Sequence, residues 1–329
     1  MHFTSLFLRA AAVAFFSATS TSANPVSALR SHFGTVVAFG DSLSDNGNVY
    51  RLTNRTWPAD KAYYKGRFSN GKTWVENLAK DIGVLLHPGG GPADLLDLAY
   101  GGATVNNSRI QGLTGYNSTI PVPSVLGQVR TYLKSSSKGS ISRSLFVISG
   151  GSNDAFFGLG GPIAPEELAR LTAADLLTAS RRLYKAGARY FLIPGVAALQ
   201  SIPYVNDYGE AYEPSLDSYG DAFYDYLKAH VDDAGGKGAT VVLFDQRTAL
   251  TSFINKKKQR PDWNVEDACL KGVYPGEAPV RSLCSDPDKH VFFDIYHPSR
   301  VTHKYIARAA LETIFTTITG KALPLTFTR

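Results

Sequence analysis

Short apolar runs alternate with longer amphipathic segments along most of this chain of 329 residues. Runs rich in β-branched and other apolar residues predict strands at 35–39, 95–100, 144–149, 190–194 and 239–245. Apolar positions three and four residues apart predict helices at 73–82, 125–134, 165–186, 216–233 and 299–317. Strands that alternate with helices predict a parallel sheet that is covered by helices on both faces.

Two stretches break this alternation, at residues 49–70 and 256–290. Each is too long for an ordinary connection between a helix and a strand, and long loops in a compact domain are usually functional or disordered. We therefore expect both stretches to shape a cleft.

The first 23 residues have the pattern of a secretory signal peptide. An apolar stretch surrounds Arg9, and small residues at Thr21 and Ala23 suit cleavage near position 23. Residues 24–329 contain no linker, repeat or low-complexity tract, so we expect a single domain. No later stretch is apolar for long enough to span a membrane, which predicts a soluble, secreted protein without a stable membrane anchor.

The two cysteines, Cys269 and Cys284, predict a disulfide in an exported protein, and two independent buried thiols are the alternative. Glycosylation sequons begin at Asn54, Asn106 and Asn117, and they matter only if the host is eukaryotic.

The formal net charge of +6 comes from scattered basic residues, so the sequence shows no footprint for nucleic acid. The histidines are dispersed and no His-Glu-x-x-His pattern occurs, so we expect no metal.

The first predicted strand leads directly into Gly40-Asp41-Ser42-Leu43. Open α/β folds place their chemistry at the carboxyl ends of strands, so Ser42 is a candidate nucleophile. Gly, Asp and Ser are also ordinary turn and helix N-cap residues, so a plain turn is the alternative.

Three later segments could supply partners for Ser42. Asp294 and His297 stand three positions apart before the last predicted helix, where a carboxylate can orient an imidazole. A capping aspartate and a surface histidine are the alternative. Asn153 and the glycines after Tyr100 follow predicted strands, where they could contact a reacting oxygen or only form tight turns.

In content, order and spacing these segments resemble the sequence blocks of the GDSL or SGNH esterase/lipase hydrolases, which carry Ser, Gly, Asn and His in that order. The matching segments are Gly40 to Leu43, Tyr100 to Ala103, Gly151 to Asp154 and Asp294 to His297. Gly66 to Gly71 and Trp74 to Glu76 are similar to a stretch of the secreted plant, fungal and bacterial members. The resemblance covers nearly the whole mature chain and implies a flavodoxin-like three-layer αβα sandwich with a central parallel sheet.

Residue by residue, the resemblance implies Ser42 as nucleophile, His297 as general base and then acid, and Asp294 as the group that orients His297. It implies an oxyanion hole made by the N–H groups of Ser42 and Gly101 and the side chain of Asn153.

The second block is the loosest, because Tyr100 stands where the family often has a small residue. The donor could therefore be Gly102 in place of Gly101.

Other residues near these blocks have plainer interpretations. Asp41, Asp45 and Asp154 are expected to be turn and supporting groups, and His303 to face solvent on the last helix. His290 competes with His297 for the role of base but has Pro287 where an acid would stand. Aromatic residues that could line an acyl or sugar pocket, or simply be core, are Trp57, Tyr63, Tyr64, Phe156 and Phe157.

These observations predict a secreted serine esterase, monomeric and without a cofactor, that works through an acyl-enzyme. Resemblance to secreted fungal carbohydrate acetylesterases favours acetylated plant cell-wall oligosaccharides as substrate. A lipase or phospholipase that acts on lipid esters is the closest alternative, because the same catalytic residues would serve it. A non-catalytic carbohydrate-binding protein on the same fold is a third possibility.

Overall fold

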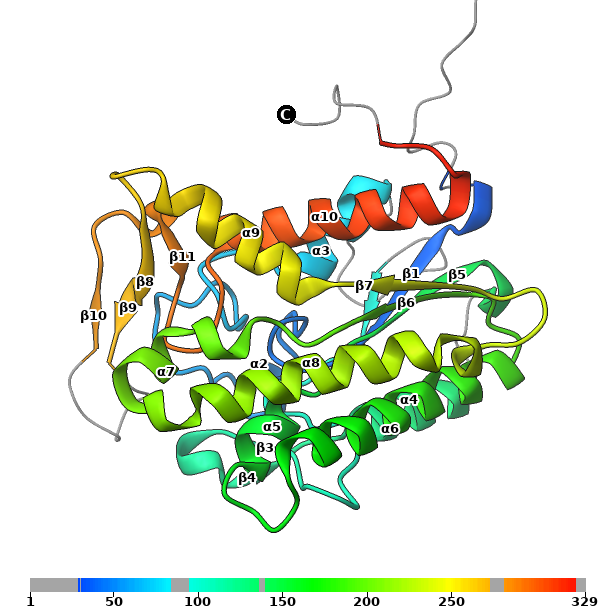
Figure 1. The fold of residues 1–329 in the computed structure, drawn as a ribbon, viewed down its shortest axis with the longest axis horizontal. Helices are drawn as coiled ribbons and strands as arrows, with labels where there is room; N and C mark the ends of the chain where they lie inside the picture. The colour runs from blue at the N-terminus through cyan, green and yellow to red at the C-terminus, as the bar shows by residue number, and fades with distance from the viewer. Residues whose placement is uncertain (1–28, 30, 84–94, 136–139, 273–280, 324–329) are drawn as a thin grey trace, which may run out of the picture.

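Five parallel strands form the sheet that the apolar runs predict. The computed structural model describes residues 29, 31–83, 95–135, 140–272 and 281–323 (Figure 1). The strands are β1 (Thr35–Phe39), β2 (Leu95–Asp97), β5 (Ser144–Ile148), β6 (Tyr190–Pro194) and β7 (Thr240–Phe244). They lie in the order β2-β1-β5-β6-β7, which is 2-1-3-4-5 along the chain, the flavodoxin-like order.

The central strands β1 and β5 explain the continuous apolar runs in the sequence. They pair in parallel from Thr35 and Ser144 to Phe39 and Ile148, and all their residues are buried. A parallel strand with helices on both faces has no polar side, so its sequence shows no alternation.

Helices cover both faces of the sheet (Figure 1). One layer contains α3 (Trp74–Ile82), α9 (Gln246–Lys258) and α10 (Arg300–Thr319), with α10 packed against α3 and α9. The other contains α4 (Val125–Lys134), α6 (Pro165–Lys185) and α8 (Glu213–Ala229), with α6 packed against α4 and α8. The predicted three-layer αβα sandwich is therefore confirmed.

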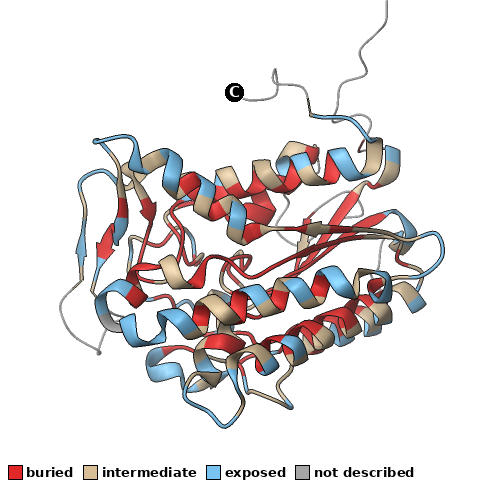
Figure 2. Ribbon diagram, in the orientation of Figure 1, coloured by how far each residue is buried: buried red, intermediate tan, exposed pale blue. Residues whose placement is uncertain are grey.

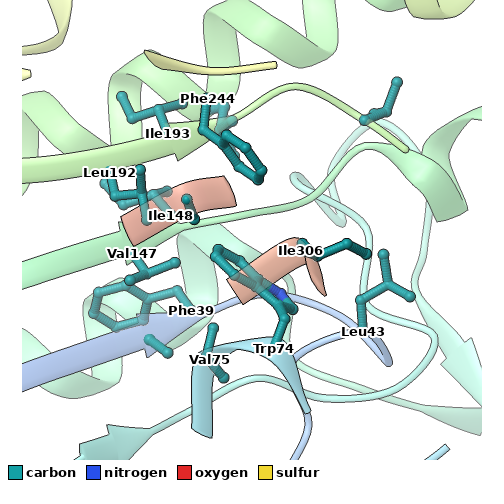
Figure 3. Packing of buried hydrophobic residues seen from close by; sticks show 14 of the residues in the cluster. Phe39, Leu43, Trp74, Val75, Val147, Ile148, Leu192, Ile193, Phe244 and Ile306 are labelled. Carbon is teal, nitrogen blue, oxygen red and sulfur yellow. The ribbon is translucent and has the colours of Figure 1, made fainter. Parts of the chain in front are cut away.

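The core lies between the sheet and these helices. Figure 2 shows the sheet and the inward sides of the helices as buried. In Figure 3, Phe39 and Val147 of the sheet lie near Trp74 and Val75 of α3, with Ile306 of α10 beside them.

Several helices begin where their sequences place a capping residue. The Thr73 side chain accepts from the N–H of Glu76, and the Glu76 carboxylate accepts from the N–H of Thr73, so α3 begins with a capping box. Ser124 and Ser299 cap α4 and α10 in the same position. Each cap satisfies backbone groups that the helix leaves unpaired.

Shorter elements complete the described chain. They are α2 (Asn48–Leu52), α5 (Ser152–Gly158), α7 (Pro203–Tyr208), the antiparallel pairs β3 (Leu113–Thr114) with β4 (Ile120–Pro121) and β9 (Leu270–Lys271) with β10 (Ser282–Leu283), and the parallel pair β8 (Asn264–Ala268) with β11 (His290–Phe292). Single 3₁₀ turns lie at Tyr116–Ser118, Ile141–Arg143, Leu199–Ser201, Glu210–Tyr212, Val231–Ala234 and Pro287–Lys289.

Besides these short elements, the structure differs from the predicted main elements at several points. Strand β2 ends at Asp97, and α8 ends at Ala229, after which a separate 3₁₀ turn follows. Helix α9 was not predicted, because few of its residues are apolar and only Gln246, Leu250 and Phe253 are buried. Within the described residues, no helix combines the length and apolar character needed to cross a membrane. The proposed signal peptide lies outside the described residues.

Candidate active site

Three of the predicted site segments follow neighbouring strands of the sheet. Ser42 follows β1, Gly102 follows β2 and Asn153 follows β5, and these strands are adjacent in the order β2-β1-β5. Chain order reverses between β1 and β5, and open α/β sheets bind ligands at such a switch point. Asp294 and His297 reach the same edge from the segment between β11 and α10.

Ser42, His297 and Asp294 form an unbroken chain of hydrogen bonds. The Oγ of Ser42 lies 2.8 Å from Nε2 of His297. Nδ1 of His297 lies 2.8 Å from Oδ1 and 2.9 Å from Oδ2 of Asp294. Asp294 is fully buried and His297 is 6% exposed. The structure thus brings together the three residues that the sequence singled out for acyl transfer.

The partners of His297 fix its tautomer. Burial raises the pKa of Asp294, but the charge and hydrogen bond of His297, a hydrogen bond from Tyr63 and the charge of Arg281 outweigh burial and lower that pKa below its ordinary value. An ionised carboxylate can only accept hydrogen bonds, so Nδ1 carries a proton and donates to Asp294. Nε2 is then free to accept the proton of the Ser42 hydroxyl.

Buried polar groups hold the loop of residues 40–43, which carries Ser42. The side chain of Gln128 in α4 accepts from the N–H of Gly40 at 2.8 Å and donates to its carbonyl at 2.8 Å. The Asp41 carboxylate accepts from the N–H of Leu43 at 3.0 Å. Burial raises the pKa of Asp41, although the bond from Leu43 and the nearby His297 lower it. Nothing in the sequence points to Gln128, because a single amide in a helix has no distinctive pattern.

Gly101 cannot serve as the predicted oxyanion donor in this arrangement, because its N–H donates to Oδ2 of Asp45 at 2.9 Å. A Cβ at Gly101 would also lie 2.3 Å from the ring of Phe68, so the residue must be small for packing. Gly102 lines the cleft beside Ser42, and its φ of 84° favours glycine. Among the described residues, the N–H groups of Ser42 and Gly102 have no acceptor. The geometry therefore favours Gly102 over Gly101.

Asn153 lines the same cleft. One N–H of its side chain donates to the carbonyl of Ala103 at 3.0 Å, which holds the amide in place and leaves the second N–H for another acceptor. Asn153 therefore remains the candidate side-chain donor to an oxyanion.

Two buried carboxyl groups, of Asp45 and Asp154, connect the loops that follow β1, β2 and β5 by hydrogen bonds. Asp45 accepts from the N–H groups of Gly47, Asn48 and Val49 as well as Gly101. Burial raises its pKa even though these four bonds lower it. The carboxyl of Asp154 binds the N–H of Val105 at 3.0 Å and 3.2 Å, and burial raises its pKa to about 7. Both residues support the loops, as the sequence predicted for them.

A cleft of about 390 Å³ opens beside Ser42. Its lining includes Ser42, Asn153 and His297, other polar side chains such as those of Thr114, Ser118 and Ser152, and many apolar side chains. The apolar part includes Leu113, Phe156, Phe157, Leu159, Leu199 and Ile202.

Of the aromatic residues named from the sequence, Trp57, Phe156 and Phe157 line the cleft. Tyr63 is buried beside Asp294, at hydrogen-bond distance from it. Tyr64 is half-buried beside the cations of Lys65 and Arg67.

The first long stretch shapes the cleft as predicted, because Trp57 and Phe68 line it. It also supports the segment of His297. The ring of Phe68 lies 5.3 Å from that of His297, and the Ser69 hydroxyl donates to the carbonyl of Pro298 at 2.9 Å. The side chain of Asn70 accepts from the N–H of Arg300 at 2.7 Å.

The second long stretch behaves differently from the prediction. None of its described residues lines the cleft. It contains the disulfide between Cys269 and Cys284, which confirms the predicted pairing. Nδ1 of His290 lies 3.6 Å from Sγ of Cys284 and 3.0 Å from the carbonyl of Asp286, so His290 does not approach Ser42. Among the described residues, Cys269, Cys284 and His290 form the one cluster with metal-ligand atoms close together, and its sulfurs are bonded to each other.

The prediction that His303 faces solvent is wrong. The side chain is 1% exposed, and its Nδ1 accepts from the N–H of Trp74 at 3.2 Å, so it caps the start of α3. Burial, and to a lesser degree the nearby His297, lower the pKa of His303 to about 3. The helical pattern misled the prediction because α10 packs against both α3 and α9.

The three sequon asparagines differ in exposure. Asn54 and Asn117 are exposed, whereas the Asn106 amide donates to the carboxylate of Asp175 at 3.0 Å.

A flavodoxin-like sheet with Ser, His and Asp hydrogen-bonded in series at its carboxyl edge is the architecture of a serine hydrolase. The family of GDSL-like Lipase/Acylhydrolase sequences matches residues 36–310, and the chain belongs to this family. It is a carboxylic ester hydrolase.

Known relatives cover most of the chain. The thermolabile hemolysin of Vibrio parahaemolyticus is 28% identical over 285 residues, which are 84% of this chain but only 63% of the hemolysin. The GDSL esterase/lipase EXL4 of Arabidopsis thaliana is 25% identical over 333 residues, 87% of this chain and 93% of the plant protein. Among solved structures, an acetylxylan esterase from Geobacillus stearothermophilus is 14% identical with a TM-score of 0.42, covering 85% of this chain and 94% of the esterase.

Proposed function

We propose that the protein hydrolyses carboxylic esters with Ser42 as nucleophile, His297 as general base and then acid, and Asp294 as the orienting carboxylate. The observation that supports this most directly is the continuous chain of hydrogen bonds from the Ser42 hydroxyl through His297 to Asp294. The N–H groups of Ser42 and Gly102 and the side chain of Asn153 form the proposed oxyanion hole.

The proposed reaction has two halves. In the first, Oγ of Ser42 attacks the ester carbonyl while its proton passes to Nε2 of His297, and the oxyanion hole holds the negative oxygen. Nε2 then gives the proton to the leaving alcohol, and an acyl-enzyme forms. In the second half, His297 takes a proton from water, which attacks the acyl carbon and releases the acid.

Substitution Ser42→Ala tests this assignment. Hydrolysis of p-nitrophenyl butyrate and labelling by a fluorophosphonate should both disappear, because Ser42 is the one serine among the described residues with a hydrogen bond to the His297 ring. Ser44→Ala is the matched control, since the Ser44 hydroxyl accepts from the indole of Trp74 and lies outside the reaction path. Wild-type turnover by Ser42→Ala would contradict the proposal.

For the substrate, the cleft supports an ester with an apolar acyl chain longer than acetyl. A volume of about 390 Å³ exceeds many times the roughly 30 Å³ of a single water, which is close to the size of an acetyl methyl group. Apolar residues such as Phe156, Leu159 and Ile202 would bury such a chain favourably. We therefore propose lipid-type esters as the first substrate class.

Acetylated oligosaccharides, which the sequence favoured, are the second candidate. Their support is a set of aromatic rings at the cleft: Tyr204 and Tyr296 stack at 4.8 Å, and Phe157 and Tyr212 are 39% and 43% exposed. Aromatic faces of this kind can stack on sugar rings.

An acyl-chain series from p-nitrophenyl acetate to palmitate separates the two candidates. If the cleft binds the acyl chain, kcat/KM rises from acetate toward medium chains, and Leu159→Trp lowers activity on the longer esters while acetate turnover is kept. A steep fall from acetate onward, with acetylated xylooligosaccharides as better substrates, would favour the carbohydrate candidate.

We also propose that the protein is secreted as a monomer, with residues 1–23 removed. The disulfide and the exposed sequon asparagines Asn54 and Asn117 support an exported chain. The mass of the secreted form, with and without glycosidase, tests cleavage and glycosylation together.

A further inference from the structure

The Asp294 carboxylate accepts hydrogen bonds from the backbone and from the side chains of Tyr63 and His297. Oδ1 accepts from the N–H groups of Tyr296 at 2.8 Å and His297 at 2.7 Å. Oδ2 accepts from the hydroxyl of Tyr63 at 2.5 Å. Both oxygens also lie within 2.9 Å of Nδ1 of His297. The backbone therefore fixes one oxygen, and a single side chain from 231 positions away in sequence fixes the other.

Tyr63 is itself held firmly. Its side chain is buried, and its ring packs edge to face on Phe293 at 5.3 Å and on Phe68 at 6.4 Å. Burial, and next the charge of Asp294, raise the pKa of Tyr63 well above its ordinary value. The hydroxyl therefore stays protonated and acts as a donor to Asp294.

Arg281 extends the chain of hydrogen bonds behind Tyr63. Its guanidinium donates to the Tyr63 oxygen at 3.0 Å and lies 5.3 Å from the centre of the ring. A cationic donor polarises the hydroxyl, which then donates more strongly to the carboxylate. Five groups are thus linked in series: Arg281, Tyr63, Asp294, His297 and Ser42.

The position of Arg281 is set by the disulfide hairpin, which is the antiparallel pair of β9 and β10 beside the Cys269–Cys284 bond. The residue directly precedes β10, whose Leu283 pairs with Leu270 of β9. The N–H of Leu270 donates to the carbonyl of Phe293 at 2.6 Å, one residue before Asp294. Both long irregular stretches therefore meet at the carboxylate of Asp294.

We propose that Tyr63, supported by Arg281, is a positioning residue for ester hydrolysis: its hydroxyl holds the Asp294 carboxylate in the plane of His297 Nδ1 and takes up part of its negative charge. This inference rests on the proposed roles of Ser42, His297 and Asp294. It assigns a chemical function to the contact between the two long stretches.

Tyr63→Phe tests the inference because it removes only the hydroxyl. We expect kcat per active site, counted by fluorophosphonate labelling, to fall about tenfold, the effect of one hydrogen bond to a charged group, with KM changed less than twofold. Without the donor, Asp294 keeps more of its charge and stabilises a protonated His297. The acid limb of the kcat/KM profile should therefore move about half a pH unit toward higher pH.

Two further variants complete the test. Arg281→Gln should shift the acid limb in the same direction by a smaller amount. Tyr64→Phe removes a neighbouring hydroxyl outside the cleft and should leave kcat and the pH profile unchanged.

Wild-type kcat and an unmoved acid limb in Tyr63→Phe would overturn the inference, as would a loss of kcat without any shift of the limb, which indicates packing alone. If Tyr63→Phe fails to fold, the acid limb of the kcat/KM profile of Arg281→Gln decides whether the inference holds. Stoichiometric labelling of Ser42 in these variants shows that the proposed nucleophile holds even where the positioning role fails, whereas an active Ser42→Ala protein would reject the proposed function itself.

Discussion

The two sides of the proposed site are built in different ways. The nucleophile side consists of the loops with Ser42, Gly102 and Asn153, which directly follow strands of one sheet and are joined by bonds from backbone N–H groups to the buried carboxylates of Asp45 and Asp154.

The base side consists of Asp294 and His297, which follow the short strand β11 outside the main sheet. Side chains from distant, irregular segments hold it: Ser69 binds Pro298 across 229 positions and Asn70 binds Arg300 across 230. One half of the site thus takes its geometry from sheet register, and the other from individual side-chain contacts. Damage to the first half should appear in catalysis, and damage to the second in both stability and catalysis.

Asn153→Ala is the sharpest test of the nucleophile side. We expect kcat to fall about 10²- to 10³-fold, because loss of one oxyanion donor costs roughly 2.7–4 kcal/mol of transition-state stabilisation. Steady-state kinetics on p-nitrophenyl butyrate measures the fall, and the melting temperature should change little.

Asn206→Ala, at an exposed position of α7, is the control. A fall of less than fivefold in Asn153→Ala would show that the Asn153 amide does not contact the developing oxyanion.

On the base side, the double substitution Cys269→Ala with Cys284→Ala should lower the free energy of unfolding by about 3 kcal/mol. The bond closes a loop with a sequence separation of 15, and in the chain-entropy model its loss frees the unfolded chain. Because the hairpin also places Arg281, kcat per labelled active site should fall as well, by less than tenfold.

Urea unfolding and active-site titration measure the two effects separately. Reduced stability with unchanged kcat would mean that the hairpin does not position the base side.

The same division explains how much the sequence could predict. The strands, five of the six main helices and Ser42 follow from apolar periodicity and from turn residues at strand ends, which are local signals. Asp294 and His297 were found through their spacing of three. The family resemblance favours Gly101 and leaves Gly102 as the alternative, and the sequence cannot decide between them because the bond from Gly101 to Asp45 joins residues 56 positions apart.

The supporting contacts of the base side could not be predicted. The sequence suggests Tyr63 only as a possible pocket residue and does not point to Arg281. Their pairing joins two irregular stretches across 218 positions, and no period or motif records such a contact. The buried position of His303 has the same origin, since its partner is the N–H of Trp74, 229 positions away.

His303→Asn tests the buried, neutral state of His303 near the base side through the pH dependence of the free energy of unfolding. The folded protein keeps His303 neutral with a pKa of about 3, while the unfolded chain takes up a proton near the usual 6.5. The unfolded state therefore binds more protons between these values, and wild-type stability falls as the pH drops through that window, by about 1 kcal/mol per pH unit.

The Asn side chain can still accept from Trp74 but does not titrate, so the variant should lose less stability between pH 6 and pH 4. Urea unfolding at both pH values measures the difference. Equal acid losses in both proteins would contradict the buried, neutral state of His303.

Asp154→Asn tests the nucleophile side by its pH dependence, which should have the opposite sign to that of His303. The pKa shift of Asp154 is the smaller of the two. The folded protein keeps Asp154 protonated up to a pKa of about 7, while in the unfolded chain the group ionises near 3.8. The folded state therefore binds more protons in this window, so wild-type stability falls as the pH rises from 4 to 7. Asn can accept from Val105 as the protonated acid does, and it carries no charge to bury. The variant should thus gain stability relative to wild type between pH 5 and pH 8 in urea unfolding, and parallel pH profiles would show that Asp154 is ionised in the folded protein.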